Sequence, residues 1–275
     1  MSVAISGRST RVRANGLNHH LLAYGGGEGD AIIMLPGITS PAATADFLAA
    51  PLAELGYRVF VPDLRGRGET DVAPAGRYRL SDYADDVAGL IASLDLDQPI
   101  ILGHSLGARI AAAYTVTYGG DKHGSLILVD PPTSGPGRGA YPTSRESFLT
   151  QLHQAKRGTT AEEVRKFYPK WPLRELQLRA EQLASCDETA VIETHEGFET
   201  EDFFSIWKGL TRPATVIRGE LSPVVPATAA VDLAEANPNI PIVAVPDAGH
   251  MVPWDNFAGF FKAIVRLLPN QAGRL

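Results

Sequence analysis

Short apolar runs recur along the chain, and segments with helical spacing of apolar positions separate many of them. The runs are rich in isoleucine, valine and leucine, which is typical of parallel strands buried on both faces of a sheet. They occupy residues 31–35, 58–61, 100–102, 126–129, 214–217 and 242–245. The helical segments occupy residues 42–55, 80–94, 106–118, 226–236 and 257–268. This alternation predicts βαβ units with right-handed crossovers.

The amino-terminal region has a different pattern. Residues 10–14 and 17–24 flank the dipeptide Asn15-Gly16, which favours a tight turn between antiparallel strands. With this hairpin added to the apolar runs, the sequence predicts an α/β fold whose eight-stranded sheet is mostly parallel and flanked by helices.

One long segment interrupts the alternation. From residue 132 to residue 208 no apolar strand run occurs, and helical patterns appear instead at residues 145–156, 160–168, 173–183 and 188–197. We interpret residues 132–208 as a helical cap inserted over the strand ends, and residues 1–131 and 209–275 as the core domain. A separate domain is the weaker interpretation, because strands resume at residue 214 and the segment has few large apolar residues.

Composition and charge narrow the classes of partner. Apolar residues make up 44% of the chain and charged residues 20%, as in a globular domain. The net charge is −6 and no long cluster of lysine or arginine occurs, which argues against nucleic acid and anionic membranes as partners. Residues 1–16 lack the apolar core of a signal peptide. Because Cys186 is the only cysteine, no intrachain disulfide can form, and we expect a cytoplasmic protein.

The segment Gly103-His104-Ser105-Leu106-Gly107 has the pattern G-x-S-x-G. It lies directly between a predicted strand and a predicted helix, which is the setting of a nucleophilic serine on a sharp turn. An ordinary glycine-rich turn is the structural alternative. We predict that Ser105 is a nucleophile.

A serine hydroxyl needs a base that removes its proton. Of the seven histidines, His250 is the best candidate, because it follows the last predicted strand. Loops at the carboxyl ends of parallel strands lie along one edge of the sheet, so His250 and Ser105 can meet there.

The sequence offers three candidates for the acid that orients the imidazole. It commonly follows the penultimate strand, where this chain has Ser222 instead of an aspartate. Asp130 ends the strand after the one that carries the serine, and we predict that it is the acid. Glu220 is the second choice and Asp247 the third; a turn or cap role is the structural alternative for Asp130. The order serine, aspartate, histidine is that of α/β-hydrolases.

An acyl-transfer site also needs donors for the oxyanion. We predict the backbone N–H groups of Leu106, which follows the nucleophile, and of Ile38, which follows an earlier strand. Gly37 would permit close approach of the substrate. The sequence indicates neither a metal site nor a cofactor.

Together these residues resemble the α/β-hydrolase superfamily over nearly the whole chain, and within it the N-formylmaleamate deformylases. The words that carry the closer resemblance are PGITSP at 36–41, VDPP at 129–132, SGPGR at 134–138, AYP at 140–142 and GHMVPWD at 249–255. Acetamidomethylenesuccinate hydrolases share GAR at 107–109 and RAE at 179–181. The resemblance implies cofactor-free hydrolysis of a formyl C–N bond, and it places the acid after the strand that follows the nucleophile.

The implied substrate is a small amide that bears a carboxylate, and a capped pocket would need a cation to bind that group. Arg109, Arg138 and Arg179 are the candidates, and each also has a structural interpretation. Trp171 and Trp254 are candidates for the pocket wall, with ordinary aromatic packing as the alternative.

Other functions stay open on the same fold. The enzyme alternatives are another small-acid amidase or an esterase, and the non-enzymatic alternative is a ligand receptor. A serine, a histidine and an acid in this order favour hydrolysis. The sequence is compatible with a monomer or a homo-oligomer.

Overall fold

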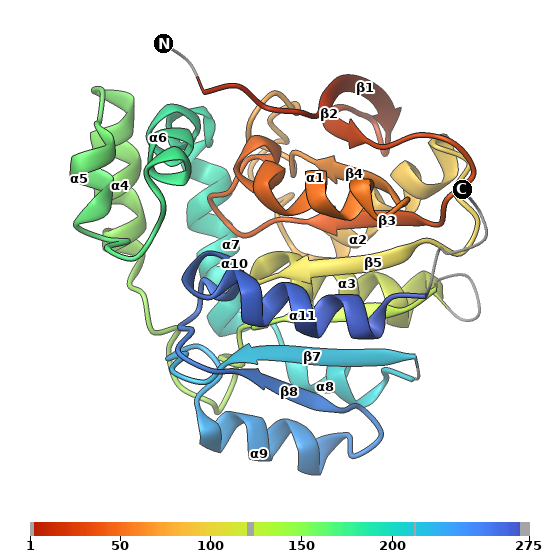
Figure 1. Ribbon diagram of the computed structural model, residues 1–275. Helices are drawn as coiled ribbons and strands as arrows, with labels where there is room; N and C mark the ends of the chain where they lie inside the picture. Colours follow the sequence, from red (N-terminus) through yellow and green to blue (C-terminus); the bar gives the residue numbers. More distant parts are fainter. Residues whose placement is uncertain (1–2, 120–123, 212, 270–275) are drawn as a thin grey trace.

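The computed structural model describes residues 3–119, 124–211 and 213–269. Its strands form one eight-stranded sheet in the order β1-β2-β4-β3-β5-β6-β7-β8 (Figure 1). The strands are β1 (Arg8–Ala14), β2 (Leu17–Tyr24), β3 (Ala31–Leu35), β4 (Arg58–Pro62), β5 (Ile100–His104), β6 (Leu126–Val129), β7 (Ala214–Gly219) and β8 (Ile242–Val245).

The sheet is parallel from β4 to β8 and antiparallel where β2 pairs with β1 and with β4. Every residue of β3, β5 and β6 is buried, because helices cover both faces of the sheet at these strands. The mostly parallel eight-stranded sheet expected from the apolar runs is therefore confirmed.

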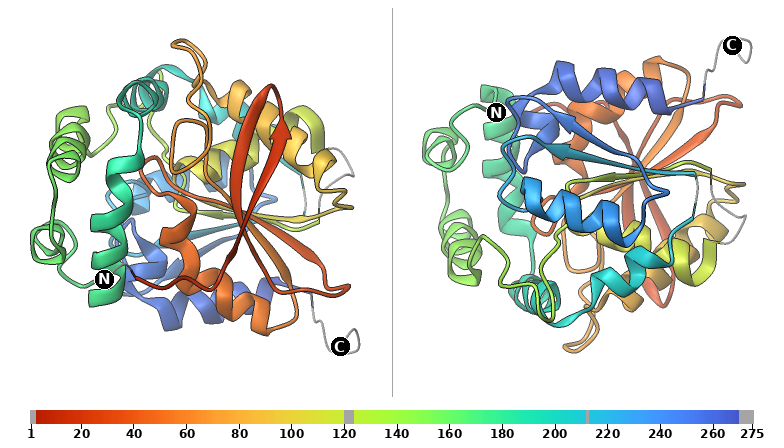
Figure 2. Two further views of the ribbon diagram at one scale, coloured as in Figure 1. Left: turned by 90° about the horizontal axis from the view of Figure 1, so that it is seen from above. Right: turned by 90° about the horizontal axis from the view of Figure 1, so that it is seen from below.

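Helices pack on both faces of the sheet (Figure 2). On one face lie α1 (Asp46–Glu54) and α11 (Phe257–Leu267). On the other face lie α2 (Leu80–Ser93), α3 (Leu106–Tyr114) and α9 (Ala227–Ala236). In the described part of the chain, no helix combines the length and the apolar character needed to cross a bilayer.

Several helix boundaries differ from those expected. The segment 42–55 begins as a 3₁₀ turn, Ala42–Ala45, before α1, and α3 ends in a π-helical turn, Thr115–Gly119. In the segment 160–168 only α5 (Ala161–Arg165) is α-helical. The short helices α8 (Phe203–Lys208) and α10 (Val252–Asp255) were not predicted, because so few residues show no periodicity.

The connection between β6 and β7 carries five α-helices among its described residues, and all of these except α8 lie toward the carboxyl ends of the parallel strands (Figure 1). Besides α5 and α8 they are α4 (Arg145–Lys156), α6 (Leu173–Gln182) and α7 (Glu188–Thr200). Leu152 and Phe198 from these helices belong to the same apolar cluster as Leu35 and Leu128 of the sheet. The helices thus pack on the sheet through a shared core, while the domain boundaries at 132 and 208 stay a prediction.

Candidate active site

Ser105 lies on a sharp turn between β5 and α3. Its backbone has φ 55° and ψ −118°, and its N–H donates a 2.9 Å hydrogen bond to the carbonyl of Val129. The glycines on either side allow strand and helix to approach. A Cβ on Gly107 would lie 2.0 Å from the carbonyl oxygen of Leu35, and one on Gly103 would lie 2.2 Å from that of Gly107. The motif therefore requires glycine at both positions.

We expect Gly103→Ala to lower the free energy of unfolding by about 3 kcal/mol or more, because the added methyl group meets fixed backbone atoms. Gly26→Ala is the matched control, since nothing lies within 4 Å of its Cβ position. Urea denaturation measures both variants. Equal stability of the two would contradict the close approach.

The structure brings Ser105, His250 and Asp130 together. The Ser105 hydroxyl lies 3.0 Å from His250 Nε2, and His250 Nδ1 lies 2.8 Å from Asp130 Oδ2. Because a carboxylate only accepts hydrogen bonds, Nδ1 carries the proton and Nε2 is left to accept from the serine. This is the arrangement of a nucleophile, a base and an orienting acid.

Asp130 is completely buried and its carboxylate is well supplied with donors. Besides the imidazole, it accepts the N–H of Gly219 at 3.0 Å and the hydroxyl of Ser222 at 2.5 Å. Ser222 thus supports the acid from the loop after β7. Glu220 and Asp247, the two alternatives, are exposed, and neither forms a hydrogen bond with His250 among the described contacts.

His104 holds the loop that carries His250. Its Nε2–H donates a 3.0 Å hydrogen bond to the backbone carbonyl of His250. Burial, together with the nearby His250, lowers the pKa of His104 to about 3. His104 is therefore neutral at physiological pH and acts as a structural donor.

A cavity of about 160 Å³ opens beside the Ser105 hydroxyl. This is smaller than the roughly 300–1,000 Å³ of pockets for drug-sized ligands, so it suits a small substrate. It is lined by Gly37, Ile38, Thr39, Ser40, His104, Ser105, Tyr141, Thr143, Phe148, Gln151, Tyr168, Arg179, His250 and Met251.

This fold and geometry agree with known proteins. The profile of the alpha/beta hydrolase fold family matches residues 30–257. The chain belongs to the α/β-hydrolase family. It is 37% identical to an N-formylmaleamate deformylase of Pseudomonas putida, over 96% of each chain. A crystal structure of an N-formylmaleamic acid deformylase from Pseudomonas putida superposes with a TM-score of 0.87, at 36% identity over 94% of this chain and all of the other.

A second relative of this hydrolase is more distant. It is a 2-(acetamidomethylene)succinate hydrolase of Mesorhizobium japonicum, which is 31% identical over 82% of this chain and 83% of its own. A crystal structure of an E-2-(acetamidomethylene)succinate hydrolase superposes with a TM-score of 0.78, at 26% identity over 95% of this chain and 98% of the other. The two resemblances noted in the sequence are therefore both confirmed.

The loop after β3 forms one wall of the cavity. Gly37 and Ile38 lie there, and a Cβ on Gly37 would be 3.6 Å from that of Ser105. Arg67 donates from Nε to the Ile38 carbonyl at 3.0 Å, and this fixes the loop. On the other side of the serine, Leu106 begins α3, where backbone N–H groups have no partner inside the helix. Both residues expected to supply oxyanion donors thus lie next to the serine.

Arg179 is the arginine that reaches this cavity. It comes from α6, and only 4% of its surface is exposed. Its guanidinium donates to both the carbonyl and the hydroxyl of Thr39. Among the described residues, no carboxylate lies within 4.0 Å of it. A buried guanidinium that lacks an anionic partner is a favourable place for a substrate carboxylate.

The other two predicted arginines lie elsewhere. Arg109 is buried between α3 and the end of α7, where it donates to the carbonyls of Phe198 at 3.3 Å and Glu201 at 2.9 Å. Burial lowers its pKa to about 10. It is not among the lining residues of the Ser105 cavity, and its hydrogen bonds join α3 to the end of α7 instead. This position does not support the prediction that Arg109 binds substrate.

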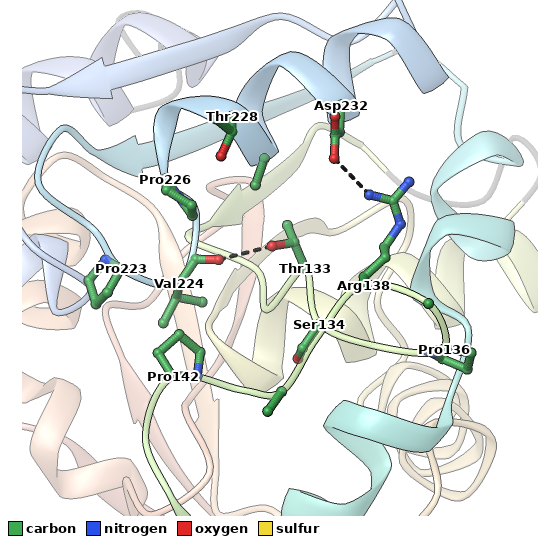
Figure 3. A pocket seen from close by; sticks show the side chains of 13 residues that line it. Thr133, Ser134, Pro136, Arg138, Pro142, Pro223, Val224, Pro226, Thr228 and Asp232 are labelled. Atoms are coloured by element: carbon green, nitrogen blue, oxygen red, sulfur yellow. Dashed lines mark hydrogen bonds and ion pairs between the residues drawn. The ribbon is translucent and has the colours of Figure 1, made fainter.

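Arg138 lines a different, open cavity of about 570 Å³, which contains neither Ser105 nor His250 (Figure 3). There it forms a 2.9 Å ion pair with Asp232 of α9. The sequence did not predict this position of Arg138, because the path of the loop before α4 depends on tertiary packing. The expectation that Arg138 contacts the substrate is therefore not supported.

Trp171 and Trp254 stand behind the cavity rather than in its wall. Their ring centroids lie 5.1 Å apart, and the two rings are stacked. Each ring packs against a residue that lines the cavity: Trp171 lies 4.2 Å from Tyr168, and Trp254 lies 5.5 Å from His104, both between centroids. This placement agrees with the alternative interpretation, ordinary aromatic packing, in which the two tryptophans support the residues of the cavity wall.

Sequence reasoning missed several residues of the cavity wall, chiefly Tyr141, Phe148, Gln151 and Tyr168. They come from the cap, where periodicity predicts helices but not which side chains face Ser105. Only Tyr141 had a signal, since it lies in the AYP word that the chain shares with the deformylases. Within the described ranges, no group of three or more histidine, cysteine, aspartate or glutamate side chains is arranged to hold a metal ion.

Proposed function

We propose that this hydrolase cleaves the formyl C–N bond of N-formylmaleamate and releases maleamate and formate. The observation that carries the proposal is that one small cavity contains both the Ser105 hydroxyl, paired with His250, and the guanidinium of Arg179, which has no carboxylate partner among the described residues. The similarity to an N-formylmaleamate deformylase over 96% of the chain supports the substrate. The single, buried cysteine suits a cytoplasmic enzyme.

In the first step the Ser105 oxygen attacks the formyl carbon and His250 Nε2 takes the hydroxyl proton. Asp130 accepts from Nδ1 and stabilises the imidazolium that forms. The formyl oxygen becomes an oxyanion, and the N–H groups of Ile38 and Leu106 donate to it. The contacts of Ser105 with His250 and of His250 with Asp130, and the position of Ile38 in the cavity wall, support these roles.

The tetrahedral adduct then collapses. The C–N bond breaks, its electron pair goes to the nitrogen, and His250 Nε2 gives the nitrogen a proton, so maleamate leaves. Water attacks the remaining formyl ester, His250 takes one proton of the water and returns it to the Ser105 oxygen, and formate departs. The leaving nitrogen carries a second acyl group, which makes its departure easier than from a simple amide.

Arg179 binds the remote carboxylate in this proposal. We expect Arg179→Met to lower kcat/KM for N-formylmaleamate about 10- to 150-fold, because a charge-assisted contact is lost. The same variant should change kcat/KM for neutral p-nitrophenyl formate about threefold or less. Formate release and nitrophenol absorbance measure the two reactions.

Arg109→Met is the matched control, since it removes a buried guanidinium outside the cavity. We expect it to lower the thermal midpoint and to affect both substrates alike. If Arg179→Met also affected both substrates alike, Arg179 would support the Thr39 loop and not the substrate.

The acetamidomethylenesuccinate hydrolase relative makes a related amide the second candidate substrate. Steady-state rates of the purified enzyme on N-formylmaleamate, 2-(acetamidomethylene)succinate and p-nitrophenyl esters discriminate the candidates. The proposal requires N-formylmaleamate to have the highest kcat/KM of the acids. A preference for the acetamide would transfer the assignment to that substrate, and turnover of esters only would indicate an esterase. A receptor would give no acyl-enzyme burst.

A further inference from the structure

Tyr141 brings a second hydroxyl to the catalytic imidazole. Its phenol oxygen lies 3.3 Å from His250 Nε2, the atom that also faces the Ser105 hydroxyl at 3.0 Å. The residue precedes α4, at the start of the cap segment, and lines the cavity. Its ring is held by Phe198, at a centroid distance of 4.7 Å, and by Phe148 at 6.3 Å.

The phenol has no acceptor of its own once reaction begins. In the free enzyme the phenol also hydrogen-bonds the Ser105 side chain. Nε2 has a single lone pair, and the shorter contact with Ser105 uses it in that state. After attack, Nε2 holds the serine proton and donates, while the Ser105 oxygen is bonded to the substrate carbon. The hydroxyl of Tyr141 must then donate to another atom, or remain buried without a partner.

Burial also keeps the phenol a donor. Only 5% of the Tyr141 surface is exposed, and desolvation raises its pKa well above the usual value. The residue therefore stays protonated while charge develops on the substrate. It can stabilise that charge by donating a hydrogen bond, and it keeps its own proton throughout.

The position of Nε2 shows which part of the substrate lies closest to the phenol. Nε2 protonates the departing nitrogen, so the phenol beside it lies on the leaving-group side, whereas Ile38 and Leu106 serve the formyl oxygen. We propose that Tyr141 donates to the acyl oxygen attached to the departing nitrogen and thereby makes the enzyme selective for diacylamines. This inference rests on the proposed function.

The chemistry of the leaving group explains why a hydrogen bond from Tyr141 would accelerate cleavage. As the C–N bond breaks, the electron pair that moves to nitrogen is delocalised onto the adjoining acyl oxygen. A hydrogen bond at that oxygen is stronger in the transition state than in the bound substrate, so it accelerates cleavage instead of only tightening binding. A leaving group without such an oxygen gains nothing from Tyr141.

Tyr141→Phe tests the role, because it removes only the hydroxyl and keeps the ring contacts. The substrates are N-formylmaleamate, the neutral diacylamine N-formylacetamide, and p-nitrophenyl formate, which has the same formyl group on a leaving group without an acyl oxygen. We expect kcat to fall about 10- to 100-fold on both diacylamines and about threefold or less on the ester. Tyr118→Phe, which removes a phenol that bonds Asp85 far from the cavity, is the control and should match the wild type on all three.

The outcomes separate this inference from the proposed function. Equal losses on the ester and the diacylamines mean that Tyr141 only supports His250, and they overturn the inference while the proposed function stands. A rise in KM with unchanged kcat also overturns it. If the wild-type enzyme hydrolyses the ester but neither diacylamine, the proposed function fails and the inference fails with it.

Discussion

Ser105→Ala is expected to abolish turnover, with kcat for N-formylmaleamate falling by about five to six orders of magnitude. Of the described hydroxyls in the cavity, that of Ser105 has the shortest contact with the base, at 3.0 Å from His250 Nε2, and it lies on the turn between β5 and α3. The fold should be unchanged, since the substitution keeps the Cβ and the backbone hydrogen bond to Val129. Formate release and the thermal midpoint measure the two effects.

Ser93→Ala is the matched control for this experiment. It removes a serine hydroxyl that bonds the carbonyl of Arg13 at the surface, and its rate should stay within about twofold of the wild type. A serine-directed phosphonate should label Ser105 and nothing else. Near-normal turnover in Ser105→Ala, or labelling at another residue, would reject the assigned nucleophile.

Asp130→Asn should lower kcat by about four orders of magnitude. The carboxylate accepts from His250 Nδ1, and this keeps Nε2 free to take the serine proton. An amide at the same place can donate to Nδ1, which favours the tautomer whose Nε2 is already protonated. Such an imidazole is no longer a base toward the serine.

Glu220→Gln is the control for the acid, because Glu220 is exposed and makes no hydrogen bond to His250 among the described contacts. We expect its kcat to stay within about twofold of the wild type. The reverse ranking, with Glu220→Gln the slower variant, would assign the acid to the loop after β7.

The sequence alone located those residues whose position in the fold follows from their place directly after a predicted strand. A nucleophile motif directly after a buried strand must lie at the carboxyl end of that strand, so Ser105 could be placed from residues 103–107 alone. His250 followed from the same rule, because all parallel strands of one sheet end at a common edge. The sheet itself followed from the apolar runs, since strands buried on both faces show little but apolar residues.

Order along the chain could only rank the acids. Asp130, Glu220 and Asp247 all follow strands at the same edge and all lie between Ser105 and His250 in sequence, so the ranking rested on which strand each one follows. The three-dimensional arrangement decided which carboxylate contacts the imidazole: Asp130 is fully buried and accepts from His250, and Ser222 donates to it from the loop after β7. Hydrogen bonds between residues so far apart leave no local pattern in sequence.

The contacts of the helical segment 132–208 were even less predictable from sequence. Its helical periodicity was visible, but periodicity identifies the buried face of a helix and not the neighbour that buries it. The sequence offered no reason to prefer Arg109, Arg138 or Arg179 as a ligand of the substrate, and tertiary packing separated them. Arg109 joins α3 to the end of α7, Arg138 pairs with Asp232, and Arg179 lines the cavity. Tyr141 reaches the imidazole only because the chain returns over the strand ends. The sequence by itself predicted the fold and the positions of Ser105 and His250, whereas the contacts of Asp130, Arg179 and Tyr141 depended on packing between distant segments.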